Sequence, residues 1–162
     1  MPGMRKLTRD ERGDSLVEFA VSAIILFTVI FGIMDFSRAL FIYHFASYAA
    51  QEGTRYAVVR GSYWSGTSCA STTSSNCEAT SSEITTFVKD MAPAAVSSGS
   101  ITVTPSWPGK LPNGSTGSCS TTASTDGCLV KVEVQVTFSF ILPFLPKNSM
   151  TFVGTSEGVV QR

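Results

Sequence analysis

The stretch that decides the fold reads Arg12-Gly13-Asp14-Ser15-Leu16-Val17-Glu18-Phe19-Ala20, and no further charged residue follows before Asp35. As an α-helix rising 1.5 Å per residue, Leu16 to Met34 would be about 28 Å long, close to the hydrocarbon thickness of a bilayer. Its single charge is Glu18. A carboxylate at the centre of a membrane helix costs ~2.5 kcal/mol or more, so a charge retained there usually has a use. The stretch predicts a transmembrane segment over about residues 16–38 and marks Glu18 as a candidate functional residue.

The charges on either side of this segment predict its orientation. Residues 1–13 contain four basic residues against two acidic ones, and the next basic residue is Arg38. Because basic residues favour the cytoplasmic side, we expect a cytoplasmic N-terminus and an extracytoplasmic C-terminal part. The whole chain has 12 basic and 12 acidic residues, which argues against nucleic acid as a partner.

Two other interpretations of the apolar segment stay open at this stage. A cleaved secretory signal would have a shorter apolar core, and the Ser47-Tyr48-Ala49 site is separated from it by Asp35 and Arg38. A plain membrane anchor explains the length of the segment but gives no reason for Glu18.

The helix is predicted to continue well beyond the membrane. Residues 35–60 contain no proline and carry a loose helical stripe of apolar side chains. One helix of about 45 residues, starting near Asp14 or Ser15, is therefore expected, with Gly32 and Gly53 as candidate kink positions.

Two charged pairs share the i, i+3 spacing on this helix and can pair on one face: Asp35 with Arg38, and Glu52 with Arg55. The first pair either contacts a partner subunit at the membrane surface or ends the lipid-embedded part. The second is expected to be a solvated or packing pair.

The C-terminal half predicts a small α+β head. Residues 82–91 have the pattern of a short amphipathic helix with Ser82 as N-cap. Apolar and polar residues then alternate over 130–140, which indicates a strand with one buried face. Weaker strand patterns at 101–105 and 150–161 complete an expected three-stranded antiparallel sheet, which would pack on the helices. The turn between the last two strands is placed at Pro143 to Pro146.

Four cysteines follow the apolar segment, and an even number in an oxidising compartment predicts disulfides. Three pairings are formally open; the preferred one joins Cys69 to Cys77 and Cys119 to Cys128. These spacings do not match a zinc site. The sequence contains no recognisable catalytic triad, phosphate-binding loop or metal-ligand cluster, so neither an enzyme nor a cofactor is expected. Trp64 and Trp107 lie in predicted loops, where they either anchor an interface or cover the sheet.

Three groups of residues along the helix together resemble a known family. Gly13 with a carboxylate five residues later is similar to a type IV prepilin processing site. Leu16-Val17-Glu18-Phe19-Ala20, Gly32-Ile33-Met34-Asp35-Phe36-Ser37-Arg38-Ala39 and Ala49-Ala50-Gln51-Glu52-Gly53-Thr54-Arg55-Tyr56-Ala57 resemble, in that order, the TadE-like family. These proteins are minor pilins or pseudopilins of the Tad (tight-adherence) pilus machinery. The resemblance covers about residues 12–60.

The resemblance implies a prepilin peptidase that cuts between Gly13 and Asp14. It also implies that Glu18, and by extension Asp35 and Arg38, set the register between neighbouring helices, while Glu52, Gly53, Arg55 and Tyr56 form a family motif. Asp14 departs from the apolar residue that often follows the cleaved glycine of type IV pilins. Its charge would weaken the attraction of Glu18 for an incoming amine.

The expected architecture is a basic leader over 1–13, a long helix over 14–60 and an extracytoplasmic head over 61–162, in a type IV pilin-like α+β fold. The expected function is a minor pilin or pseudopilin of the bacterial inner membrane. Its partners would be the lipid bilayer, other Tad pilus subunits, the inner-membrane assembly platform and the prepilin peptidase, and it could also enter the pilus. The alternative is a secreted or membrane-anchored domain for binding or adhesion.

Overall fold

The computed structural model describes residues 11–61, 64, 78–122, 124–141 and 149–161. A long helix α1 (Glu11–Val59) is followed by a short helix α2 (Ser81–Asp90) and a 3₁₀ turn (Ser98–Ser100). Three strands complete the chain, β1 (Ile101–Ser106), β2 (Leu129–Ser139) and β3 (Ser149–Val159). They form one antiparallel sheet in the order β1-β2-β3. The long helix, the short helix and the three-stranded antiparallel sheet confirm the predicted α+β, pilin-like fold.

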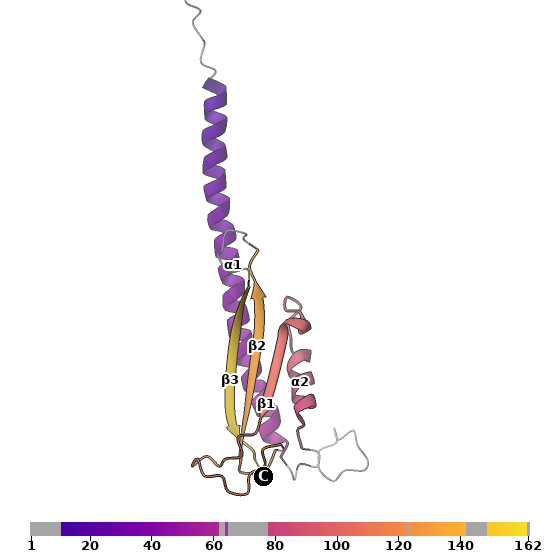
Figure 1. Ribbon diagram of the computed structural model, residues 1–162. Coiled ribbons are helices and arrows are strands. Elements are labelled where there is room, and N and C mark those ends of the chain that lie inside the picture. The colour runs from indigo at the N-terminus through magenta and orange to yellow at the C-terminus, as the bar shows by residue number, and fades with distance from the viewer. Residues whose placement is uncertain (1–10, 62–63, 65–77, 123, 142–148, 162) are drawn as a thin grey trace, which may run out of the picture.

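Helix α1 extends far beyond the head (Figure 1). All 49 residues of α1 are helical, and the helix continues through Gly32 and Gly53, the two candidate kink positions. The described part of the helix already includes Glu11, three residues before the expected start near Asp14. Nothing in Glu11-Arg12-Gly13 stops a helix: a single interior glycine costs only ~1 kcal/mol, which the rest of a long helix can absorb.

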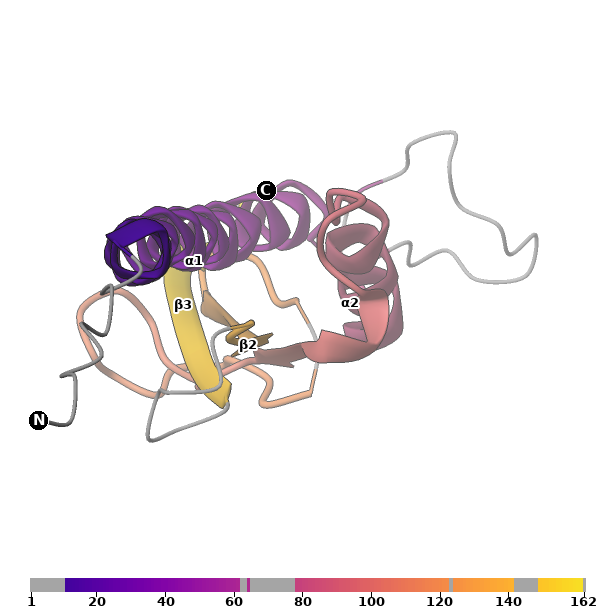
Figure 2. The same ribbon diagram turned by 90° about the horizontal axis from the view of Figure 1, so that it is seen from above.

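The sheet packs one face against both helices, with α1 over β2 and β3 and α2 beside β1 (Figure 2). Strand β2 follows the predicted alternation, and its inward-facing side chains are almost completely buried. These residues are Val130, Val132, Val134, Val136 and Phe138. The sequence therefore located the central strand and its buried face correctly.

Small residues let α1 approach the sheet closely. Ala46, Ala49, Ala50 and Ala57 are completely buried in the core. A Cβ added at Gly154 of β3 would lie 2.2 Å from the carbonyl oxygen of Ala46, so a larger residue does not fit at this crossing. The head is thus attached along the second half of α1 by backbone-to-backbone proximity.

Helix α2 is capped two residues earlier than predicted. The N-cap is Thr80, whose hydroxyl accepts from the Glu83 backbone N–H, while the Glu83 carboxylate accepts from the Thr80 N–H. This reciprocal capping box satisfies two otherwise unpaired donors, so Ser82 lies inside the helix. Ile84 and Val88 are buried against the core as the amphipathic pattern predicts.

The two tryptophans cover parts of the head. Trp107 packs against the core, and its indole N–H donates to the Ser124 hydroxyl at 2.9 Å. Trp64 lies under the Arg60 guanidinium, 4.6 Å from the ring centroid. The Pro143 to Pro146 turn lies outside the described residues.

Candidate functional site

The N-terminal half of α1 forms no part of the core. In its most apolar 18-residue window the mean hydropathy is 2.5, and none of that window is buried. By length and composition, α1 is the one helix among the described residues that could cross a membrane. A core helix of the same composition would be covered by the rest of the protein, so the exposed surface indicates a membrane anchor.

The predicted processing site lies in the first turn of α1. Gly13 is exposed, and a Cβ added there would meet nothing within 4 Å. Close packing therefore does not demand this glycine. Asp14 follows it within the same helical turn.

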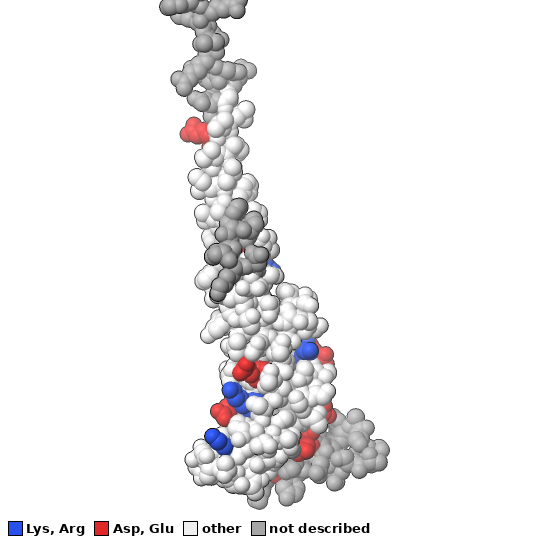
Figure 3. Space-filling view, viewed as in Figure 1, with Lys and Arg blue, Asp and Glu red and all other residues white. Residues whose placement is uncertain are grey.

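Glu18 is exposed on α1 and has no hydrogen bond or ion pair with any described residue. Over the described surface, charged side chains gather on the head, while the projecting helix is almost uncharged (Figure 3). Near the N-terminal end of a membrane-spanning helix such a carboxylate would be partly desolvated and would have no counter-charge among the described residues. The site is chemically suited to accept a cation supplied from outside the chain.

Two other polar side chains on this part of α1 form hydrogen bonds within the helix. Thr28 donates to the carbonyl of Ile24, and Ser37 donates to that of Ile33, both at 2.8 Å. In lipid, backbone and side-chain polar groups need partners within the protein. Glu18 differs from them because its carboxylate has no such donor.

Asp35 and Arg38 form the predicted i, i+3 ion pair at 3.1 Å. The structure adds a third member, since the other Asp35 oxygen accepts from the backbone N–H of Ile141, also at 3.1 Å. The Arg38 guanidinium also lies 5.2 Å from the centroid of the Phe138 ring. Asp35 is buried and so joins α1 to the end of β2 within one chain; the sequence offered no sign of this contact between residues 106 positions apart.

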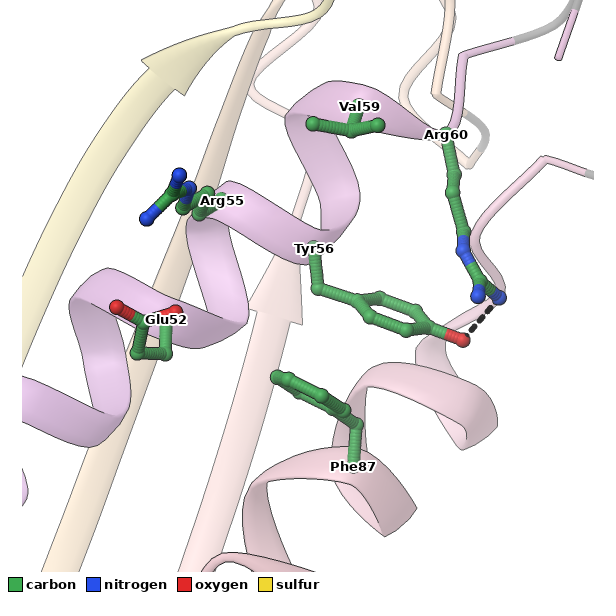
Figure 4. Close-up of a pocket in the computed structure, with 6 residues that line it drawn as sticks. All are labelled: Glu52, Arg55, Tyr56, Val59, Arg60 and Phe87. Carbon is green, nitrogen blue, oxygen red and sulfur yellow. Dashed lines mark hydrogen bonds between the residues drawn. The ribbon is translucent and has the colours of Figure 1, made fainter.

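The C-terminal family motif lines a shallow pocket of about 230 Å³ between α1 and α2. Tyr56 stacks on Phe87, with ring centroids 4.5 Å apart, and its hydroxyl accepts from Arg60 (Figure 4). Glu52 and Arg55 also line the pocket, but no hydrogen bond or ion pair joins them to each other or to other described residues. Of the two expected alternatives, a solvated pair or a packing pair, this arrangement fits the solvated one, and both side chains are available to solvent or to a partner.

Gly53 has a structural role in this motif. A Cβ there would lie 2.8 Å from a methyl group of Val88 and 3.2 Å from one of Val132. Glycine therefore lets α1 meet both α2 and β2 at once. The sequence missed Arg60 and Phe87; the only available signal was the Tyr56–Arg60 spacing of four, which places the two side chains on one helix face.

Burial raises the pKa of the Tyr56 phenol above its usual 10.0. The nearby Arg60 guanidinium opposes this shift, and the Glu83 carboxylate adds to it. The phenol therefore stays protonated at neutral pH and serves as a neutral acceptor for Arg60.

Of the four predicted disulfide cysteines, Cys119 and Cys128 are bonded to each other as preferred. The bond closes part of the loop between β1 and β2. Cys69 and Cys77 lie outside the described residues. Within the described part of the chain, no group of three or more His, Cys, Asp or Glu side chains could hold a metal ion.

A family model described as TadE-like protein matches residues 13–55. The match confirms, over these residues, the resemblance seen in the sequence. It starts at the candidate cleavage glycine and ends at Arg55, within α1. No curated protein and no solved structure matches the chain.

Proposed function

We propose that this chain, which carries a TadE-like segment over most of α1, is a minor pilin or pseudopilin-like component of Tad-type pilus assembly. It acts by contacts between helices in the bacterial inner membrane and by contacts of its head outside it. Its N-terminus is cytoplasmic, and its partners are other pilus subunits and the inner-membrane assembly platform. It performs no catalysis.

The observation that carries this proposal is the overlap between the segment matched by the family model and the exposed apolar half of α1. The family match starts at Gly13 and includes the exposed apolar half of α1 with its unpartnered carboxylate, Glu18. A prepilin peptidase cuts after Gly13, and Glu18 then accepts the N-terminal ammonium of a neighbouring subunit. In a low-dielectric setting, such pairing offsets part of the desolvation cost of both charges.

The secretory-signal alternative is disfavoured by the packing of α1. Cleavage after Ala49 would remove five residues of the buried core: Ala39, Ile42, Phe45, Ala46 and Ala49. It would also remove Asp35, the partner of Ile141. A head that started at Ala50 would expose much of one face of its sheet.

The decisive experiment replaces Glu18 with glutamine in the full chain and measures co-purification with pilus subunits together with pilus output. We expect both to fall strongly, while tryptophan fluorescence shows a folded head. Glu157→Gln on β3 is the matched control, and it should leave both readouts unchanged. Unchanged co-purification in Glu18→Gln would reduce Glu18 to an ordinary residue at the helix start.

Processing is tested separately by intact mass and N-terminal sequencing of the mature protein. A chain that starts at Asp14 supports the proposal. Retention of Met1 would favour a plain anchor, and a start at Ala50 would favour a secreted binding domain.

A further inference from the structure

The end of the head nearest the projecting helix carries exposed apolar side chains at one level of α1. We name this surface the collar and define it by Phe36, Arg38, Ile141 and Met150. Phe36 is 65% exposed, Ile141 71% and Met150 48%. Such side chains in an ordinary head would be expected to face the core or a partner.

Three contacts hold the collar against the helix. The Ile141 N–H donates to Asp35, and Arg38 pairs with the other oxygen of the same carboxylate. Met150 lies opposite Phe138 in the antiparallel β2–β3 register, and the Phe138 ring lies under Arg38. Ile141, after β2, and Met150, at the start of β3, therefore lie near the level of residues 35–38 of α1.

The length of the apolar helix places this level at a bilayer boundary. From Leu16 to Asp35 an α-helix rises about 28 Å, and the hydrocarbon core of a bilayer is about 30 Å thick. With Leu16 at one boundary, Asp35 and the attached Ile141 reach the other. The collar is continuous with the exposed apolar surface of the membrane-spanning part.

The charge at the collar also suits a lipid surface. The Arg38 side chain is 45% exposed although its guanidinium pairs with Asp35, so it remains accessible from outside the chain. Arginine on an amphipathic stem places its apolar part against hydrocarbon and its guanidinium among phosphates. Apolar side chains flanked by such a cation are typical of the membrane–water interface.

We propose that the collar is a second membrane contact, in which Ile141, Met150 and Phe36 enter the interfacial region of the bilayer and Arg38 binds lipid phosphate. The head then sits directly on the outer surface of the membrane, with its β2–β3 end in lipid, and does not stand off on a free length of helix. This contact fixes the depth and tilt of α1, and with them the height at which Glu18 meets a neighbour. The inference rests on α1 spanning the bilayer, as in the proposed function.

The test uses the full chain in phospholipid nanodiscs, with an environment-sensitive fluorophore on an introduced cysteine under non-reducing conditions. The reporter is Ile141→Cys, and Met150→Cys is a second, independent reporter. Val153→Cys is the matched control. Val153 lies on the same strand and is as exposed as Met150, but it is farther from the apolar half of α1. Ile25→Cys reports on the spanning segment itself.

We expect Ile141 and Met150 labels to shift to the blue and to be quenched by lipids brominated near the glycerol end of the chains. The Val153 label should remain in water, and the Ile25 label should be quenched by lipids brominated deep in the chains. Arg38→Gln should reduce the quenching at Ile141.

Three results would overturn the proposal that the collar contacts the membrane. A quenched Ile25 label with an unquenched, water-exposed Ile141 label would leave the membrane span intact and refute the second contact alone. A blue shift at Ile141 without quenching by any brominated lipid would show that a protein surface covers it. Loss of quenching at Ile25 as well would remove the span and, with it, the membrane part of the proposed function.

Discussion

The two halves of α1 belong to one helix yet meet different surroundings. Residues 15–34 expose large apolar side chains such as Phe19, Ile24 and Phe27, whereas the half after Asp35 buries alanines against a sheet. The halves differ in charge, and also in the size of the side chains at the positions that face the sheet. Small residues allow a sheet to approach the helix backbone, while large apolar residues keep other elements away and suit fluid hydrocarbon.

The largest contrast compares Gly154 of β3, which lies against the second half of α1, with Gly32 in the first half. Gly154→Ala would place a Cβ 2.2 Å from the Ala46 carbonyl oxygen, where only backbone could move. We expect a loss of more than about 3 kcal/mol in the free energy of unfolding, at the upper end of overpacking effects. Denaturant titration of the full chain in detergent, followed by tryptophan fluorescence, measures it. Gly32→Ala, whose Cβ would meet nothing, is the control and should leave head stability unchanged; equal effects of the two would contradict the contrast.

Removing the Cys119–Cys128 disulfide tests whether the stability of the head depends on a covalent cross-link, which the exposed half of α1 lacks. Replacing both Cys119 and Cys128 with serine opens a loop with a sequence separation of 9. Loop-closure entropy for that length predicts a loss of about 2–3 kcal/mol in the free energy of unfolding. Helicity of the exposed half of α1, followed by hydrogen exchange, should not change. A parallel loss of protection over residues 15–34 would show that the two halves are coupled.

Asp35 marks the boundary between the halves and tests the contact directly. Asp35→Ala leaves the Ile141 N–H and Arg38 without their shared acceptor, which should cost about 1–3 kcal/mol. Hydrogen exchange at the Ile141 amide should accelerate. Asp35→Asn keeps an acceptor oxygen and should retain part of the protection, so identical behaviour of the two variants would count against this role.

The smallest expected effect concerns the pH dependence of stability that arises from Tyr56, near the C-terminal end of α1. Because the folded state raises the pKa of Tyr56, its contribution to stability is complete below pH 10.0 and is lost as pH rises through the folded pKa. Absorbance titration of phenolate formation, as the difference between the protein and Tyr56→Phe, should show late ionisation of this tyrosine. Arg60→Gln should delay it further, because the guanidinium lowers the pKa; earlier ionisation would reverse that assignment.

Much of this architecture was readable from the sequence because it depends on local pattern. Residue-by-residue alternation identified β2, and the amphipathic period identified α2. The uncharged run before Asp35 identified the exposed half of α1. The start of α1 and the cap of α2 were misplaced, since several neighbouring residues can begin a helix and the choice among them costs little energy.

By itself, the sequence determined the apolar span, the position of Glu18 along it and the family to which residues 13–55 are similar. Those properties follow from composition and from order along one helix. The tertiary structure alone decided that Asp35 binds the Ile141 amide and that Gly53 and Gly154 are sites of close approach. These depend on contacts between residues up to 108 positions apart, such as Ala46 with Gly154, and packing in three dimensions selects such contacts without any signature in the local sequence.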